Sequence, residues 1–190
     1  MTQKRTLDLD KVLAKATEMI ESRGLSEMTM PNLAKALGVR SQSLYHYVKN
    51  RSQLLSLVAA SRIRLLYQDL LKQLVGLSGH EALFKFADVV RDRLLEDQAL
   101  ATLLYHVDEI SDNLEVVKEV VKILDLGDQL QVDTEHVVSQ HALVGAVLGY
   151  VFLDRFIDGQ EKVESPREAE ENYHEMIWRL VSPSVQQSNA

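Results

Sequence analysis

The densest group of side chains with binding chemistry lies between residues 40 and 49, which read RSQSLYHYVK. Arg40 and Gln42 carry the paired hydrogen-bonding groups that match the edges of guanine and adenine, so we expect them to read bases in duplex DNA. Lys49 carries an ammonium group suited to a phosphate. The hydroxyl and imidazole groups between them are further candidates for base edges, thymine methyl groups or phosphates: Ser41, Ser43, Tyr45, His46 and Tyr47. Of these, we expect the Tyr47 hydroxyl at a phosphate.

Two short helices are expected to hold these side chains in position. Apolar residues with helical spacing lie on both sides of Gly38, and these are Leu33, Ala34, Leu37, Val39, Leu44 and Val48. A capped helix after Thr29, a reversal at Gly38 and a second helix over about residues 41–47 form the pattern of a helix-turn-helix. Thr29 is a further candidate phosphate contact, with helix capping alone as the alternative.

The run LAKALGV at residues 33–39, followed by LYHYVKNR at residues 44–51, resembles the DNA-binding segment of the TetR family of bacterial regulators. The resemblance covers about residues 7–57 and implies DNA contacts for Tyr45, Tyr47 and Lys49. This chain departs from the family pattern at Arg40, where a small capping residue is usual. It departs again at Val48, where an aromatic residue is common, and at Arg51, where lysine is common.

The composition favours an all-α protein, with 46% hydrophobic residues and only 3 Pro and 8 Gly among 190 residues. We expect a helix-turn-helix DNA-binding domain over residues 1–52 and a helical effector-binding and dimerisation domain over residues 53–184. Residues 185–190 are expected to form a disordered polar tail. Helical periodicity predicts helices over residues 8–23, 29–37, 41–47, 51–74, 80–96, 99–107, 113–124, 132–158 and 166–181. Residues 108–112 and 125–131 are expected to form loops or fraying helix ends.

Charge is unevenly distributed along the chain. Residues 1–64 hold 11 Lys and Arg against 5 Asp and Glu, whereas residues 65–190 hold 10 against 23. A basic end on an acidic body suits a protein that presents one end to a polyanion. The absence of cysteine excludes disulfides, and no apolar run is long enough to cross a bilayer, so we expect a cytoplasmic protein.

The last two predicted helices carry a candidate dimer interface. Ala142, Gly145 and Gly149 fall on one helical face at which another helix could approach closely. The final helix has an apolar stripe that includes Tyr173, Ile177 and Leu180. In the resembled family the last two helices form a four-helix interface with those of a second subunit. The alternative is that both helices only complete the core of a single chain.

A ligand cavity is a more plausible site in the body than a catalytic centre. Its candidate walls combine aromatic and aliphatic side chains with a few polar tips, namely Phe86, Leu103, His106, Tyr150, Phe152 and Trp178. Ordinary core packing explains the same set. The resemblance implies a small-molecule effector here, and we expect no cofactor.

No catalytic triad, nucleotide-binding loop or HExxH motif is present in the sequence. Histidines and carboxylates near His106, at Glu135 and His136, and at His141 leave a metal-dependent enzyme or sensor as the rival from another class. A structural, nucleoid-associated protein is the rival among DNA binders. We expect a homodimeric repressor that a small-molecule effector releases from its operator. The operator should be palindromic, because the two DNA-binding domains (the heads) of a dimer bind half-sites about 34 to 36 Å apart on one duplex.

Overall fold

A computed structural model describes residues 7–110, 114–130, 138–157 and 165–182. Every regular element in these ranges is a helix, as the all-α prediction requires. The chain forms two compact units, one of Met1–Leu65 with Asp97–Val120 and the other of Leu66–Glu96 with Val121–Ala190. We call these the amino-terminal unit and the carboxyl-terminal unit.

Two helices run through both units, α4 over Arg51–Gln73 and α7 over Leu114–Leu130. The amino-terminal unit also contains the elements α1 (Leu9–Arg23), η1 (Leu25–Glu27), α2 (Met30–Leu37), α3 (Ser41–Leu44), α6 (Gln98–Tyr105) and η2 (Val107–Glu109). The carboxyl-terminal unit contains α5 (Gly79–Glu96), α8 (Gln140–Ile157) and α9 (Pro166–Val181).

Capping side chains fix the starts of α1 and α9. The Asp8 carboxylate accepts a hydrogen bond from the Lys11 amide at 2.8 Å, and its hydrogen bonds with Lys11 lower its pKa. Ser165 and Glu168 form a reciprocal capping box at the start of α9, which confirms the start expected there. Hydrogen bonds from Ser165 lower the pKa of Glu168, because they favour its charged form.

The helix α7 continues to Leu130, so residues 125–130, for which a loop or a fraying helix end was predicted, belong to the helix. Gly127 lies inside this helix, and a Cβ atom there would collide with the side chain of Gln140. Glycine at this position thus allows close approach between α7 and the start of α8. The helix predicted over residues 132–158 begins at Gln140, and residues 131–137 lie outside the described ranges.

Arginine side chains of α4 bind buried carboxylates within the amino-terminal unit. Asp97 is 3% exposed; it caps α6 through the Leu100 amide at 2.9 Å and accepts from Nε of Arg62 at 2.7 Å. Glu119 is 2% exposed and accepts from Arg64 at 2.9 Å and 3.1 Å. These ion pairs attach α6 and α7 to α4.

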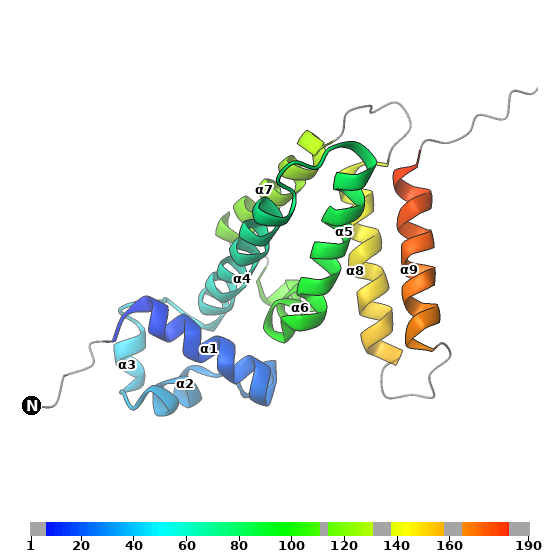
Figure 1. Ribbon diagram of the computed structural model, residues 1–190. Coiled ribbons are helices and arrows are strands. Elements are labelled where there is room, and N and C mark those ends of the chain that lie inside the picture. Colours follow the sequence, from blue (N-terminus) through cyan, green and yellow to red (C-terminus); the bar gives the residue numbers. More distant parts are fainter. Residues whose placement is uncertain (1–6, 111–113, 131–137, 158–164, 183–190) are drawn as a thin grey trace, which may run out of the picture. The chain divides into compact units, whose positions relative to one another are not determined.

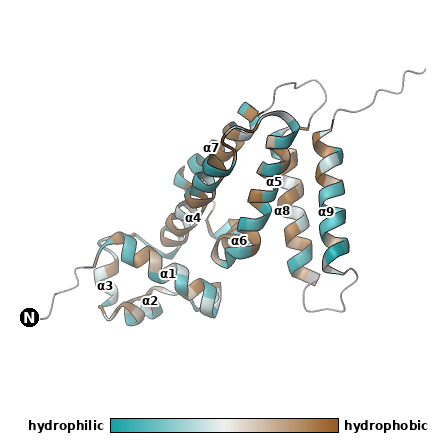
Figure 2. Ribbon diagram, in the orientation of Figure 1, coloured by the Kyte–Doolittle hydropathy of each residue, from teal (hydrophilic) through white to brown (hydrophobic). Residues whose placement is uncertain are grey.

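In the carboxyl-terminal unit, α5, α8 and α9 lie side by side (Figure 1). The helix α8 is largely brown and white, whereas α9 carries much more teal (Figure 2). Arg155 donates to the carbonyl oxygens of Leu94 and Leu95, which satisfies acceptors at the end of α5. Within the described ranges no helix has the length and apolarity that crossing a membrane requires.

Replacing Asp97 is expected to destabilise the protein. Asp97→Ala leaves the guanidinium of Arg62 without its carboxylate and α6 without its cap, so the free energy of unfolding should fall by about 2 to 3 kcal/mol. Asp97→Asn keeps a capping oxygen and should lose less. Urea unfolding at one protein concentration, followed by circular dichroism, measures both, with the exposed Asp10→Ala as the matched control. Equal stability of Asp97→Ala and Asp10→Ala would contradict this role.

Candidate nucleic-acid interface

The turn between α2 and α3 has the geometry that the sequence predicted. The Thr29 hydroxyl oxygen caps α2 by accepting from the Asn32 amide at 3.3 Å. Gly38 has φ of 69°, in the left-handed region that glycine adopts without strain. The amides of Gly38 and Val39 donate to carbonyls of the last turn of α2, the Schellman arrangement that ends a helix.

The recognition helix is shorter than predicted, since α3 ends at Leu44 rather than near Tyr47. Arg40 occupies the capping position and its side chain makes no capping hydrogen bond. Beyond Leu44 the backbone tightens, with the Tyr47 amide donating to the Leu44 carbonyl at 2.9 Å. Leu44 is 0% exposed and Val48 is 2% exposed, and their burial holds this segment against the rest of the unit.

Apart from Thr29 at the start of α2, the side chains predicted to contact DNA lie at the cap of α3, on this helix and just after it, and most of them are exposed to solvent. Ser41 and Ser43 are half-buried. The exposed members are Arg40, Gln42, Tyr45, His46 and Lys49. With Leu44 facing inward, the segment presents donors, acceptors and cations outward, which is the arrangement that groove binding requires.

The hydroxyl of Tyr47 is already engaged within the protein. It donates to the Leu7 carbonyl at 2.6 Å and ties the segment after α3 to the start of α1. A phosphate contact donated by this hydroxyl requires that bond to break. The Thr29 hydroxyl differs, because the hydrogen bond that it accepts as a cap leaves its proton available to a phosphate.

Lys49 precedes α4 and keeps its ammonium group exposed, while its backbone amide is engaged. That amide donates to Oε1 of Gln53 at 2.6 Å, and the Gln53 amide donates to Oδ1 of Asn50 at 2.8 Å. Asn50 and Gln53 therefore cap the start of α4 with their side chains. The Lys49 side chain remains the group here that can approach a phosphate.

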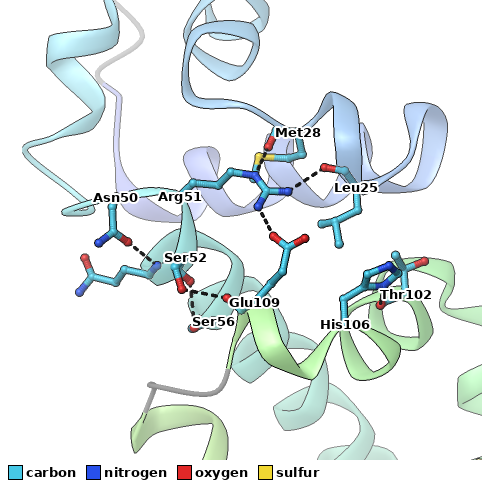
Figure 3. Close-up of polar contacts among 10 residues, drawn as sticks. Leu25, Met28, Asn50, Arg51, Ser52, Ser56, Thr102, His106 and Glu109 are labelled. Carbon is cyan, nitrogen blue, oxygen red and sulfur yellow. Dashed lines mark hydrogen bonds and ion pairs between the residues drawn. The ribbon is translucent and has the colours of Figure 1, made fainter.

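Arg51 is a residue whose role the sequence did not reveal. Its guanidinium group faces the protein interior and contacts Leu25, Met28 and Glu109 (Figure 3). In the sequence, Arg51 stood out only as a departure from the lysine that is common at this position of the resembled family. The signal that could have identified an internal partner is an acidic residue 58 positions later, which no local pattern connects to Arg51.

The residues predicted to line a ligand pocket do not form one set. Leu103 is buried and His106 exposed in the amino-terminal unit, while the others belong to the carboxyl-terminal unit. Phe86 is fully buried, and Phe152 and Trp178 are exposed at 43% and 57%. Tyr150 is half-buried and donates to the Ala169 carbonyl at 2.5 Å.

An open groove of about 560 Å³ lies in the carboxyl-terminal unit and is lined by Leu77, His80, Glu81, Phe84, Lys85, Asp88 and Trp178. The residue shared with the prediction is Trp178. Burial raises the pKa of Asp88, and the neighbouring His174, whose Nε2 lies 3.4 Å from Oδ1 of Asp88, acts in the opposite direction. The sequence did not predict this groove, because much of its lining consists of charged side chains of α5, namely Glu81, Lys85 and Asp88, and the pocket prediction was based on apolar residues.

The candidate dimer residues divide by exposure. Tyr173 and Ile177 are fully buried inside the chain, and Leu180 is half-buried. The three small residues of α8, by contrast, are exposed: Ala142, Gly145 and Gly149. Open space surrounds the Cβ positions of both glycines, so this stripe of α8 is available to a second helix.

The candidate metal ligands do not assemble among the described residues. The Nδ1 atom of His106 lies 2.9 Å from the Thr102 carbonyl at the end of α6. Glu135 and His136 lie outside the described ranges. No group of three or more His, Cys, Asp or Glu side chains within those ranges could hold a metal ion.

Comparison with known proteins identifies the amino-terminal helices. Residues 12–58 match the family described as bacterial regulatory proteins, tetR family. Over 55 residues the chain is 38% identical to an HTH-type transcriptional repressor, DrrR1 of Streptomyces coeruleorubidus, a match that covers 29% of this chain and 20% of that protein's length.

Solved structures extend the similarity of fold to nearly the whole chain. The fatty acid degradation regulator FadR from Bacillus halodurans shares 17% identity, with a TM-score of 0.68 over 92% of this chain and 96% of that one. A single-residue variant of TetR from Acinetobacter baumannii AYE, solved in complex with minocycline, shares 18% identity, with a TM-score of 0.65 over 93% and 95%. Residues 12–58, from α1 to the start of α4, therefore match the tetR family of bacterial regulatory proteins, and the solved structures show that the chain shares their fold.

Proposed function

We propose that the protein is a cytoplasmic transcriptional repressor that binds a palindromic operator as a homodimer and leaves it when a small-molecule effector binds. The observation that carries this proposal is the short α3 helix, which is anchored by buried Leu44 and presents Arg40, Gln42 and Tyr45 to solvent. Arg40 and Gln42 read base edges, while Lys49 binds a phosphate at the start of α4.

The exposed glycine stripe of α8 supports the homodimer. Gly145 and Gly149 have no side chain to keep a second helix away, and exposed apolar residues follow them toward the end of α8, namely Phe152, Leu153 and Phe156. An exposed apolar stripe of this kind favours contact with another protein surface. Two heads on one duplex also contact twice as many bases as a single head.

The proposed effector acts by shifting a population of conformations. The α4 helix is continuous from Arg51 to Gln73 and belongs to both units. An effector that binds the carboxyl-terminal unit can therefore act through α4 and change the arrangement of the two DNA-binding domains at the operator. The groove lined by Phe84, Trp178 and Asp88 combines aromatic surface with charged groups, as small-molecule sites do. The minocycline complex of a protein with this fold is in keeping with such an effector.

Lys49→Ala is expected to weaken binding to every duplex by a similar factor, because a phosphate contact carries no sequence information. The magnitude of the slope of log affinity against log salt concentration should fall by about 1.8, because each of the two subunits loses one phosphate contact. Fluorescence anisotropy with an operator and an unrelated duplex measures both effects. Lys72→Ala, an exposed lysine near the end of α4, is the control and should bind as the wild type does.

Gln42→Ala is expected to change base preference rather than general affinity. Loss of a bidentate contact with a base should weaken binding to the preferred sequence by about 1 to 3 kcal/mol and leave unrelated duplexes unaffected. Selection of bound sequences from a random pool compares the two proteins position by position. An unchanged preference, together with unchanged affinity in Lys49→Ala, would refute these roles.

Gly149→Arg is expected to separate the proposed dimer without unfolding the chain. The site is open within one chain and arginine favours helix more than glycine does, so secondary structure should persist. A large charged side chain on the stripe should prevent close approach of a second helix. Sedimentation velocity should give a monomer, with operator affinity reduced, whereas Gly149→Ala should remain largely dimeric. A dimer of unchanged stability in Gly149→Arg would place the interface elsewhere.

A further inference from the structure

The guanidinium group of Arg51 has all three of its nitrogens engaged within the protein. Nε donates to the Met28 carbonyl at 2.8 Å and Nη2 donates to the Leu25 carbonyl at 3.0 Å. Nη1 forms an ion pair with the carboxylate of Glu109 (Figure 3). The side chain is 31% exposed, yet each of its nitrogens has a partner within the protein, even though it follows Lys49 and Asn50 at the start of α4.

The two carbonyl acceptors belong to the connection between α1 and α2. Leu25 opens η1, and Met28 immediately precedes Thr29, the capping residue of α2. Both residues are buried, at 7% and 0% exposure. Arg51 thus attaches the start of α4 to the point from which α2 and α3 project.

Hydroxyl groups of α4 hold the segment that carries Glu109. The Ser52 hydroxyl donates to the Glu109 carbonyl at 2.8 Å, and the Ser56 hydroxyl lies 3.4 Å from the Ile110 carbonyl. Ile110 is 3% exposed, so the end of η2 is anchored by packing as well. We call Arg51, Ser52 and Glu109 the Arg51 clamp. In this clamp the planar guanidinium group of Arg51 connects α4 to the α1–α2 connection and to η2.

We propose that Arg51 is a positioning residue for DNA binding, which orients the helix-turn-helix through the clamp and does not itself contact DNA. This inference rests on the proposed function. It also assigns a supporting role to an acidic residue, because Glu109 fixes the third side of the guanidinium group. Net charge alone predicts the opposite effect, because removing a carboxylate makes the unit more positive and should raise its affinity for DNA.

The sign of the Glu109→Ala effect tests the clamp. We expect operator affinity to fall about tenfold, the scale of one lost charge-assisted hydrogen bond, despite the gain in positive charge. Glu21→Ala removes the same charge from an exposed position of α1 and serves as the matched control, with affinity unchanged or slightly raised. Glu109 variants that bind as tightly as Glu21→Ala would overturn the proposal.

Salt dependence separates positioning by Arg51 from a direct phosphate contact. Arg51→Ala should lower affinity at every salt concentration and leave the slope of log affinity against log salt unchanged. Loss of a phosphate contact in each of the two subunits would instead reduce the magnitude of the slope by about 1.8. Arg51→Lys keeps the charge but not the planar fork, so it should bind nearly as weakly as Arg51→Ala. A reduced slope, or full recovery in Arg51→Lys, would overturn the assignment.

A double variant tests whether the two residues act as one unit. Arg51→Ala combined with Glu109→Ala should bind about as weakly as Arg51→Ala alone, because the second change removes a contact that is already lost. Additive losses would contradict a shared clamp. Stoichiometric titration of active protein separates partial unfolding, which lowers the active fraction, from a weaker dissociation constant.

The wild-type protein distinguishes failure of the clamp from failure of the proposed function. If the wild type binds its operator and Lys49→Ala weakens that binding, then normal binding by the Glu109 variants overturns the clamp alone. If the wild type ignores duplex DNA even at low salt, the proposed function fails, and the positioning role of Arg51 fails with it.

Discussion

Burial of Leu44 is the constraint on which the DNA-binding surface depends. A helix of four residues has no stability of its own, because forming its first turn is unfavourable in water. Its orientation therefore comes from Leu44 and Val48, which pack into the amino-terminal unit after the chain has reversed at Gly38. The exposed side chains of α3 therefore owe their arrangement to the burial of these two residues and not to the stability of the helix itself.

The positive charges of residues 1–64 have two roles: some bind carboxylates within the protein, and others are exposed and available to DNA. Residues 1–64 carry 11 Lys and Arg, but Arg51, Arg62 and Arg64 bind carboxylates of η2, the residue before α6, and α7. These three arginines hold the unit together, whereas Arg40 and Lys49 remain exposed. The surface available to DNA is consequently less basic than the sequence implies. Individual exposed cations therefore determine DNA binding more than the net charge does.

Local signals in the sequence predicted the parts of the fold that local chemistry controls. Thr29 and Gly38 bound α2, and Ser165 with Glu168 starts α9, because capping and reversal involve residues within a few positions of one another. Long-range contacts decided the remainder. The residues around Gly127 do not indicate that Gln140 packs against it, and the residues around Arg51 do not indicate that its partner is Glu109. The exposed DNA-binding candidates followed from local pattern, while the pocket residues required a tertiary arrangement that periodicity does not encode.

The hydrogen bond between Tyr47 and Leu7 has a practical consequence for handling this protein. It fixes the chain beside α3 at the residue where the described structure begins, and six residues extend at most about 20 Å from that point. A purification tag joined ahead of Met1 therefore starts near the surface proposed to meet the major groove.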